Sequence, residues 1–375
     1  MKFLSHSLVV CVEGYFYILL VEALFKSESA HQKRRKANWA MLAQKQIVNA
    51  LMKPEAYDED VGKVELMQTH ISFVFLTERF VYKVKKAVNF GFLDFTTLEK
   101  RRLFCEKELE LNRRLCSDMY LEVVPINKAD GVKIKGAGET VEYAVKMKRL
   151  PQEKIMSRLL EEGKVDAKLV DRIAKIIADF HEKAETNQQI SRFGALAVIE
   201  ANWKENFDQT SEFIGETISK KDYELISSKV GNFMKRNAAV FEKRVAAGRI
   251  KDCHGDIHSG NIFITNGIYI FDAIEFNDRF RYSDVAADVA FLAMDLDFRG
   301  HADLSDVFIE KYLDYSGDRE LTELLPFYKC YRAYVRGKVA SFKLNDPNVC
   351  GEEKAAAKSE ATAYFKLAAE YTKNL

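Results

Sequence analysis

The sequence predicts an α+β fold in which a small antiparallel β-rich lobe with one helix precedes a larger, mostly helical lobe. Runs of β-branched and aromatic residues, separated by turn signals, occupy residues 62–86 and 121–150. A helical pattern over residues 96–116 separates the two groups. From residue 165 onward, apolar residues recur at steps of three and four, which is typical of helices that bury one face.

The β-rich lobe is expected to hold six strands. They are predicted over residues 62–68, 70–77, 80–86, 121–128, 132–136 and 141–150. The helix between them is expected to begin with a capping box, because Thr96 and Glu99 have the required spacing. The helical lobe is expected to include residues 165–184, 284–297 and much of 303–374, with a short β island at 261–272.

Charge and cysteine content bear on the class of protein. The 57 basic and 56 acidic residues leave a formal net charge of +1, so no global positive field predicts a nucleic-acid partner. The six cysteines show no C-x-x-C spacing, which favours reduced thiols in a cytoplasmic protein over disulfides or a zinc site. No feature of the sequence indicates an oligomeric state.

The first 60 residues are expected to form an extension outside the core. Residues 7–25 are apolar and approach the length of a membrane span, but Glu13 and Glu22 are costly in a bilayer and disfavour a membrane anchor. A native start at Met41 or Met52 is the alternative. Because every predicted element begins later, we expect the first 40 residues to be dispensable.

The segment over residues 253–275 combines polar residues with a hairpin signal. Asn266 and Gly267 separate two β-branched runs, which predicts a two-residue type I′ turn. Pairing outward from that turn puts Asn261 opposite Asp272, where cross-strand Cβ atoms lie about 4.5–5.5 Å apart. An amide and a carboxylate oxygen so placed predict a Mg²⁺ site. A transition-metal site that uses the two nearby histidines is the less favoured alternative.

Residues 254–261 read H-G-D-I-H-S-G-N, and Asp272 follows the predicted hairpin. This pattern resembles the catalytic loop of kinases and, more closely, the H-G-D-x-H-x-x-N signature of the aminoglycoside phosphotransferase family. The resemblance implies a protein-kinase-like bilobal fold and the ATP- and Mg²⁺-dependent transfer of a phosphoryl group to a hydroxyl of a small molecule. It implies that Asp256 is the catalytic base or hydroxyl orienter, and that Asn261 and Asp272 hold magnesium.

The signature also contains two histidines. The family carries both His254 and His258, and we expect each to support the loop by hydrogen bonding. His254 is kept beside Asp256 as a second catalytic candidate.

The strand over residues 80–86 offers a cation for the nucleotide phosphates. Alternation puts Lys83 and Lys85 on one face. The kinase pattern of a branched residue two positions earlier matches Val81 and favours Lys83, with Lys85 as the alternative. On the following helix, Glu108 lies on the apolar, inward stripe, so we expect it to pair with the lysine.

The absence of two glycine-rich motifs argues against two other classes of nucleotide-binding protein. No G-x-G-x-x-G lies between the first two strands, which argues against a protein kinase, and no G-x-x-x-x-G-K-[S/T] occurs, which excludes a P-loop ATPase. The segments 89–106 and 271–300 resemble a bacterial subgroup that is often fused to a C-terminal P-loop kinase-like domain, and no such domain follows in the 375 residues. The resemblance covers roughly residues 60–345.

Three parts of the chain are therefore expected. They are an extension over 1–60, a nucleotide-binding lobe over 61–150, and a helical lobe over 151–375 with the catalytic loop and the acceptor site. Asp284 and Glu275 are expected to attract a polyhydroxy or amine-bearing acceptor. The alternatives to a small-molecule kinase are a nucleotide-binding regulatory module without turnover and a membrane-tethered kinase.

Overall fold

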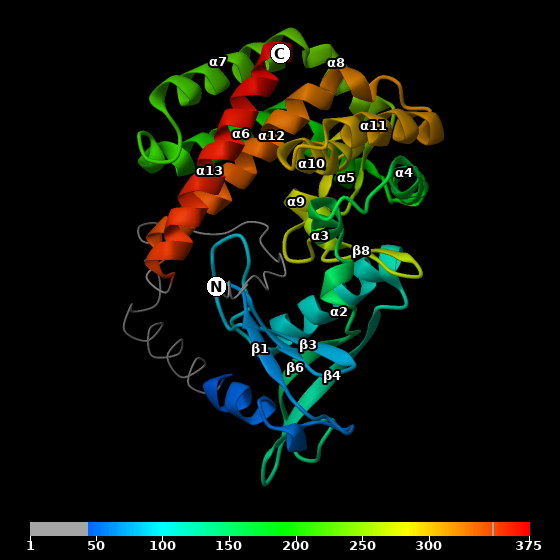
Figure 1. Ribbon diagram of the computed structural model, residues 1–375, viewed down its shortest axis with the longest axis vertical. Helices are drawn as coiled ribbons and strands as arrows, with labels where there is room; N and C mark the ends of the chain where they lie inside the picture. The colour runs from blue at the N-terminus through cyan, green and yellow to red at the C-terminus, as the bar shows by residue number, and fades with distance from the viewer. Residues whose placement is uncertain (1–43, 347–348) are drawn as a thin grey trace.

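The structure, a computed structural model, describes residues 44–346 and 349–375 and has the predicted α+β architecture (Figure 1). An antiparallel sheet with one long helix is followed by a largely helical region. The apolar segment over 7–25 and the start at Met41 lie outside the described residues, so the expectation that residues 1–40 are dispensable stays a prediction. Among the helices that the structure describes, none has the length and apolar character needed to cross a membrane.

Six strands form the main sheet, as predicted. They are β1 (Glu65–Gln68), β2 (Ser72–Leu76), β3 (Phe80–Lys85), β4 (Tyr120–Lys128), β5 (Val132–Ile134) and β6 (Glu139–Lys148). Their spatial order is β1-β2-β3-β6-β4-β5, and all neighbouring pairs are antiparallel. Strand β3 lies inside the sheet between β2 and β6, so its register and the two faces of its side chains are fixed on both sides.

Helix α2 (Leu98–Cys116) packs on one face of the sheet, against β4 and β6. It begins one residue later than predicted, because Thr97 is the N-cap and accepts the backbone N–H of Lys100 at 3.2 Å. The backbone N–H and the hydroxyl of Thr96 instead donate to Asp94. The predicted Thr96–Glu99 capping box is therefore wrong, since a local Asp94 turn takes Thr96 out of the capping position.

The opposite face of the sheet is covered by a helical segment over residues 44–51. Ile47 and Leu51 are buried in one core cluster with residues of β2, β3 and β4. The side-chain amide of Gln44 donates to the backbone carbonyl of Lys85 at 2.9 Å. These contacts precede the lobe boundary expected at residue 61, and we propose that residues 44–60 belong to the β-rich lobe.

The rest of the chain is mostly helical. Its helices are α3 (Met156–Glu161), α4 (Ala167–Lys183), α5 (Gln188–Ser191), α6 (Leu196–Thr210), α7 (Lys220–Arg236), α8 (Ala238–Ala246), α9 (Asp278–Arg281), α10 (Val285–Phe298), α11 (Ala302–Ser316), α12 (Leu321–Phe342) and α13 (Gly351–Tyr371). Two small sheets pair β7 (Ile250–Asp252) with β10 (Tyr282–Asp284), and β8 (Ile262–Ile264) with β9 (Ile268–Ile270).

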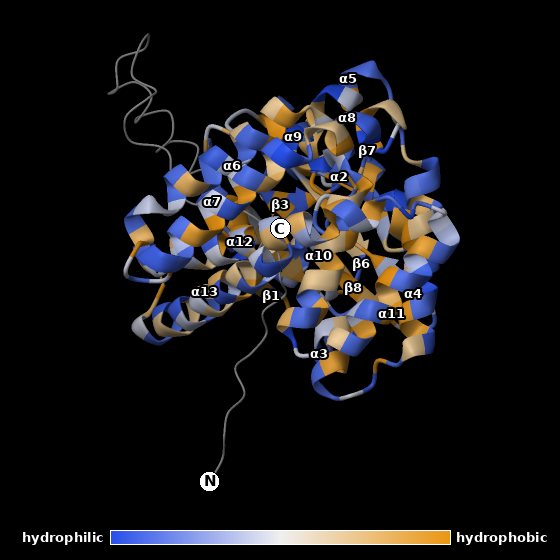
Figure 2. Ribbon diagram, turned by 90° about the horizontal axis from the view of Figure 1, so that it is seen from above, coloured by the Kyte–Doolittle hydropathy of each residue, from blue (hydrophilic) through white to orange (hydrophobic). Residues whose placement is uncertain are grey.

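Helix α10 is the centre of the helical region. Every residue from Val285 to Leu296 is buried, and α11 and α12 pack against it. Outer helices such as α4, α7 and α13 carry both hydrophilic and hydrophobic stretches in Figure 2. A helix buried on all sides normally lacks charge, so the aspartates Asp288 and Asp295 of α10 require specific partners.

We expect Leu51→Ala to lower the free energy of unfolding by about 2–5 kcal/mol, because Leu51 is 0% exposed in the core beneath the sheet. The neighbouring Met52 is 38% exposed and provides the matched control. Met52→Ala should change the free energy of unfolding by less than about 0.5 kcal/mol. Denaturant unfolding measures both variants, and equal effects would contradict the packing of residues 44–51 on the sheet.

Candidate active site

The loop that follows β7 is fixed by two aspartates of α10. Asp288 accepts the backbone N–H groups of His254 at 2.8 Å and Gly255 at 2.9 Å. About two turns further along the helix, Asp295 accepts the backbone N–H of Ser259 at 2.9 Å. Both ends of the signature loop are therefore held by buried carboxylates, which compensates the charges of the aspartates and orders the loop.

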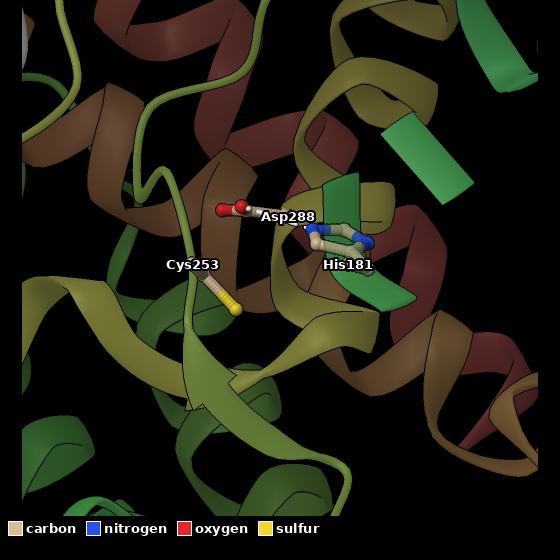
Figure 3. A group of neighbouring side chains, drawn as sticks. All are labelled: His181, Cys253 and Asp288. Carbon is tan, nitrogen blue, oxygen red and sulfur yellow. Dashed lines mark hydrogen bonds and ion pairs between the residues drawn. The ribbon is translucent and has the colours of Figure 1, made fainter. Parts of the chain in front are cut away.

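Asp288 also belongs to a buried group with His181 and Cys253 (Figure 3). One potential ligand atom from each residue lies within 4.8 Å of the others. However, the two ring nitrogens of His181 contact the Tyr312 hydroxyl at 2.8 Å and Asp288 at 3.3 Å, and the Cys253 thiol donates to the Ser283 carbonyl. These bonds make the group a support for the loop and not a candidate metal centre.

Asp256 lies at the middle of this loop and is 3% exposed. Its Oδ2 accepts the side-chain amide of Asn261 at 2.9 Å, and no described residue donates to its buried Oδ1. Burial raises the pKa of Asp256, but His258 and Arg336 lower it to below its ordinary value. Asp256 is therefore an ionised carboxylate with one oxygen available to accept a proton or a hydrogen bond.

The two histidines of the loop hold its backbone. His254 accepts the backbone N–H of Asp256 on Nδ1 at 3.3 Å, and His258 accepts that of Gly260 on Nδ1 at 3.1 Å. Burial lowers the pKa of His254 to about 4, so its ring is neutral near pH 7. The Nε2 atom of His258 lies 3.6 Å from Asp256 Oδ2. These contacts favour the supporting role, and a catalytic role for His254 stays a prediction.

The β8–β9 hairpin differs by one residue from its predicted register. Ile262 pairs with Ile270, and the backbone N–H of Phe271 donates to the Asn261 carbonyl at 3.0 Å. Asn261 therefore lies opposite Phe271 and not opposite Asp272. The predicted two-residue turn is wrong because the backbone N–H of Thr265 bonds within the connection, to the Gly267 carbonyl at 2.9 Å, which makes a three-residue loop.

Asp272 reaches the site by a bend in the backbone. Its φ of 65° lies in the left-handed region, which non-glycine residues rarely adopt. Such conformations cost free energy and persist where the surrounding structure holds them. Here the carboxylate is held by Lys83, whose Nζ lies 2.8 Å from Asp272 Oδ1.

Lys83 and Asp272 are part of a buried ion cluster. Lys83 Nζ also lies 2.9 Å from Glu108 Oε1, while Lys85 Nζ lies 2.7 Å from Glu108 Oε2 and contacts Glu275. Glu108 therefore pairs with both candidate lysines. The expected lysine–glutamate pair is present in the structure, and the role of these three residues in nucleotide binding stays a prediction.

The cluster has one negative charge in excess, because its three carboxylates face two ammonium groups. Burial raises the pKa of Glu108, but Lys83 and Lys85 lower it to about 2. The pKa of Asp272 is raised to about 6, chiefly by burial and also by Glu108 and Glu275, and Lys83 only partly offsets this rise. The charge of Asp272 is thus less fully compensated by lysine than that of Glu108.

The side-chain oxygens of Asn261 and Asp272 fit the predicted magnesium site. Asn261 gives its amide N–H to Asp256, and its buried Oδ1 has no donor within the part of the chain that the structure describes. An amide oxygen without a partner and the under-compensated carboxylate of Asp272 are ligands of the kind that Mg²⁺ uses. Removing such an amide oxygen from water without a partner is costly, and a bound cation would relieve that cost.

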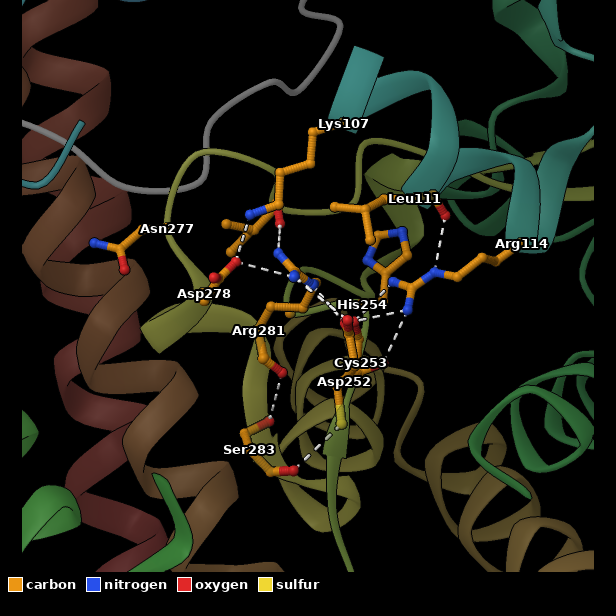
Figure 4. A network of polar contacts seen from close by, with 12 residues as sticks. Lys107, Leu111, Arg114, Asp252, Cys253, His254, Asn277, Asp278, Arg281 and Ser283 are labelled. Carbon is orange, nitrogen blue, oxygen red and sulfur yellow. Dashed lines mark hydrogen bonds and ion pairs between the residues drawn. The ribbon is translucent and has the colours of Figure 1, made fainter. Parts of the chain in front are cut away.

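Helix α2 joins the β-rich lobe to the loop (Figure 4). Arg114 donates to the backbone carbonyls of Asp252 and Cys253, both at 2.9 Å. Asn112 accepts the backbone N–H of Ala273 on Oδ1 at 2.9 Å. The helix that carries Glu108 is therefore anchored to both the start of the loop and the residue after Asp272.

Two acidic residues have partners that were not expected, and three positioning residues were not predicted from the sequence. Asp284 accepts two bonds from Arg244, at 2.8 and 2.6 Å, and Glu275 is buried against Lys85, so neither carboxylate is free to attract an amine as expected. The missed residues are Asp295, Asn112 and Arg114. An aspartate within an apolar run was an available signal for Asp295, but the partners of the other two lie far away in sequence.

We expect Lys85→Met to lower the free energy of unfolding by about 3–5 kcal/mol, because it leaves buried carboxylates without a cation. Lys85 is 0% exposed, whereas Lys83 and its partner Asp272 are nearer to solvent, so Lys83→Met should cost less. Adding Glu275→Gln to Lys85→Met should restore part of the loss. Urea unfolding of the four proteins tests this, and a wild-type stability for Lys85→Met would refute the buried pair.

The sequence matches the model of the phosphotransferase enzyme family over residues 134–325. Uncharacterized proteins of Mycobacterium bovis and Mycobacterium tuberculosis are 32% identical over 309 residues, which is 82% of this chain. The chain spans 59% of the length of these relatives.

Among solved structures, a choline kinase from Cryptosporidium parvum is similar with a TM-score of 0.50 and 13% identity, over 86% of this chain and 95% of that one. A choline/ethanolamine kinase family protein from Mesorhizobium loti has a TM-score of 0.48 and 13% identity, over 89% and 99% of the two chains. At this identity the similarity to the choline kinase shows the fold alone. The family model covers more than half of the 375 residues and includes the signature loop, so the chain belongs to the phosphotransferase enzyme family.

Proposed function

We propose that the protein is a kinase that transfers the γ-phosphoryl group of ATP to a hydroxyl group of a small molecule in the presence of Mg²⁺. The observation that carries this proposal is a pair of buried oxygens on one loop, Asp256 Oδ1 and Asn261 Oδ1, that have no hydrogen-bond partner among the described residues. The backbone carbonyl of Asn261 accepts the N–H of Phe271, the residue before Asp272, and Asp272 contacts Lys83. An acceptor-activating carboxylate, metal ligands and a phosphate-binding cation would then be neighbours. Membership of the phosphotransferase family supports the reaction class.

Asp256 is the group that would act on the acceptor. Its Oδ1 would accept a hydrogen bond from the acceptor hydroxyl and then take the proton of that hydroxyl. At the same time the hydroxyl oxygen would form a bond to the γ-phosphorus, and the bond from the γ-phosphorus to the ADP oxygen would break. Asn261 holds Oδ2, while Asp288 and Asp295 hold the loop backbone. This rigid placement lowers the entropic cost of aligning the acceptor for in-line transfer.

Lys83 is the cation that would contact the phosphates. It is 5% exposed and contacts both Glu108 and Asp272. We infer that Lys83 keeps Glu108 and exchanges Asp272 for a phosphate oxygen when the nucleotide binds. Lys85, which is fully buried between Glu108 and Glu275, would keep Glu108 in place.

Asn261 and Asp272 are the residues that would hold Mg²⁺. The ion supplies positive charge to the phosphate oxygens when it is bound. Release of Asp272 from Lys83 would leave a carboxylate oxygen available as a ligand, together with the unpartnered amide oxygen of Asn261.

We expect Asp272→Ala to abolish the Mg²⁺-dependent part of ATP binding more completely than Asn261→Ala, because the carboxylate supplies a charge and the amide only a dipole. Calorimetric titration of each variant with ATP, with and without Mg²⁺, measures the difference. If Asp272→Ala kept an undiminished metal-dependent affinity, Asp272 would not belong to the site.

We expect Asp256→Asn to leave ATP affinity close to that of the wild type and to cut phosphoryl transfer by about 10² or more. The amide is isosteric but cannot take a proton. Transfer is measured with [γ-³²P]ATP against a panel of hydroxylated metabolites, and a thermal melt controls for folding. Turnover of the variant within about threefold of the wild type would remove Asp256 from this role. If the wild type itself binds ATP but labels no acceptor, the alternative of a nucleotide-binding regulatory module would be favoured.

A further inference from the structure

A pocket on the helical lobe adjoins the catalytic loop. It is lined by residues of α6, α9, β10, α10 and α12, including Arg279, Tyr282 and Tyr331. One of its walls touches the loop directly, because a Cβ atom added to Gly255 would lie 2.9 Å from the carbonyl oxygen of Phe280, another lining residue. Gly255 immediately precedes Asp256, so the pocket and the proposed base lie on adjoining segments of the chain.

The carboxylate in the lining of this pocket is already engaged. Asp284 is 2% exposed, and both of its oxygens accept bonds from Arg244, at 2.8 and 2.6 Å. Its Oδ1 also accepts the backbone N–H of Ala286 at 2.9 Å. A cationic ligand would therefore have to displace a buried arginine to reach this carboxylate, at a large electrostatic cost.

Arg279, one of the two arginines in the lining, has an N–H donor without an acceptor among the described residues. One terminal nitrogen of Arg279 donates to Glu205 at 2.6 Å. Its Nε is buried, and no acceptor for that N–H exists among residues 44–346 and 349–375. A guanidinium has five N–H donors in a planar fork that suits carboxylate and phosphate oxygens. The tyrosines Tyr282, Tyr328 and Tyr331 add aromatic surface and hydroxyl groups to the same pocket.

We propose that the acceptor bound in this pocket carries an anionic group, a carboxylate or a phosphate, that Arg279 recognises while its hydroxyl faces Asp256. This inference rests on the proposed kinase function. It replaces the sequence-based expectation of an amine-bearing acceptor, because the acidic groups that would bind an amine are paired internally and the remaining donor capacity belongs to a cation.

The test compares acceptors of different charge with the full chain. The panel contains hydroxy acids such as glycerate, phosphorylated alcohols such as glycerol 3-phosphate, the neutral alcohols glycerol and glucose, and the cationic alcohols ethanolamine and choline. Label transfer from [γ-³²P]ATP is measured for each. We expect transfer to one of the two anionic classes, which also distinguishes carboxylate from phosphate recognition. Preferred transfer to a neutral or cationic alcohol would overturn the proposal.

Two substitutions at one ion pair separate recognition from structure. Arg279→Gln should raise the KM for the anionic acceptor about tenfold or more, with kcat and the KM for ATP little changed. Glu205→Gln breaks the same Arg279–Glu205 pair but frees the guanidinium, so it should lower this KM or leave it unchanged. A merely structural pair predicts that both variants raise the KM alike, and that result would refute the assignment.

Failure of the kinase proposal would be recognised separately. If ATP binds but no acceptor is labelled, the thermal melts of wild type and Arg279→Gln are compared with glycerate, glycerol 3-phosphate and ethanolamine. Stabilisation of the wild type by an anionic probe, lost in Arg279→Gln, would support the pocket even though the proposed reaction had failed. Stabilisation by ethanolamine only, equal stabilisation of both proteins, or no stabilisation by either anionic probe would reject it.

Discussion

The buried ion cluster around Glu108 is the interaction on which the rest of the site depends. Two lysines on one face of β3 lie in the interior, and a buried ammonium group is tolerated only with a close carboxylate. Those carboxylates come from α2 and from the segment after β9, so the requirement for charge compensation ties the sheet, its helix and the catalytic region together. Burial and the neighbouring carboxylates raise the pKa of Asp272 in this cluster, so a divalent cation beside it would stabilise its negative charge.

Buried charges also require partners in α10, where the charged groups are carboxylates and the partners are hydrogen-bond donors. Most of this helix is apolar and buried, and its two buried aspartates, Asp288 and Asp295, would be costly without donors. The donors are backbone N–H groups of the signature loop, which in turn needs acceptors because it is irregular and buried. The aspartates of α10 and the N–H groups of the loop therefore satisfy each other's hydrogen-bonding requirements. The loop is held in place, and Asp256 keeps one oxygen without a partner among the described residues. Rigid placement of this kind is what transfer between two bound molecules requires.

Much of this arrangement could be predicted from local patterns. The period-two pattern of β3 predicted a shared face for Lys83 and Lys85, and the helical stripe of α2 predicted the inward position of Glu108. Predictions that depended on a single hydrogen bond were less secure: the hairpin register was wrong by one residue because the Thr265 N–H bonds within its turn. Contacts between distant segments, such as Arg114 with Cys253, leave no local signal in the sequence. The engagement of both Asp284 oxygens could not be predicted either, since their partner Arg244 lies on a distant helix.

The exchange of partners by Lys83 is open to direct observation. A crystal structure with Mg²⁺ and a non-hydrolysable ATP analogue would show both the ion and the ammonium group. We predict that Lys83 Nζ leaves Asp272 for a phosphate oxygen while it stays within about 3 Å of Glu108, and that the ion is bound by Asn261 and Asp272. A nucleotide bound elsewhere, with Lys83 still paired to Asp272, would contradict this description of the site.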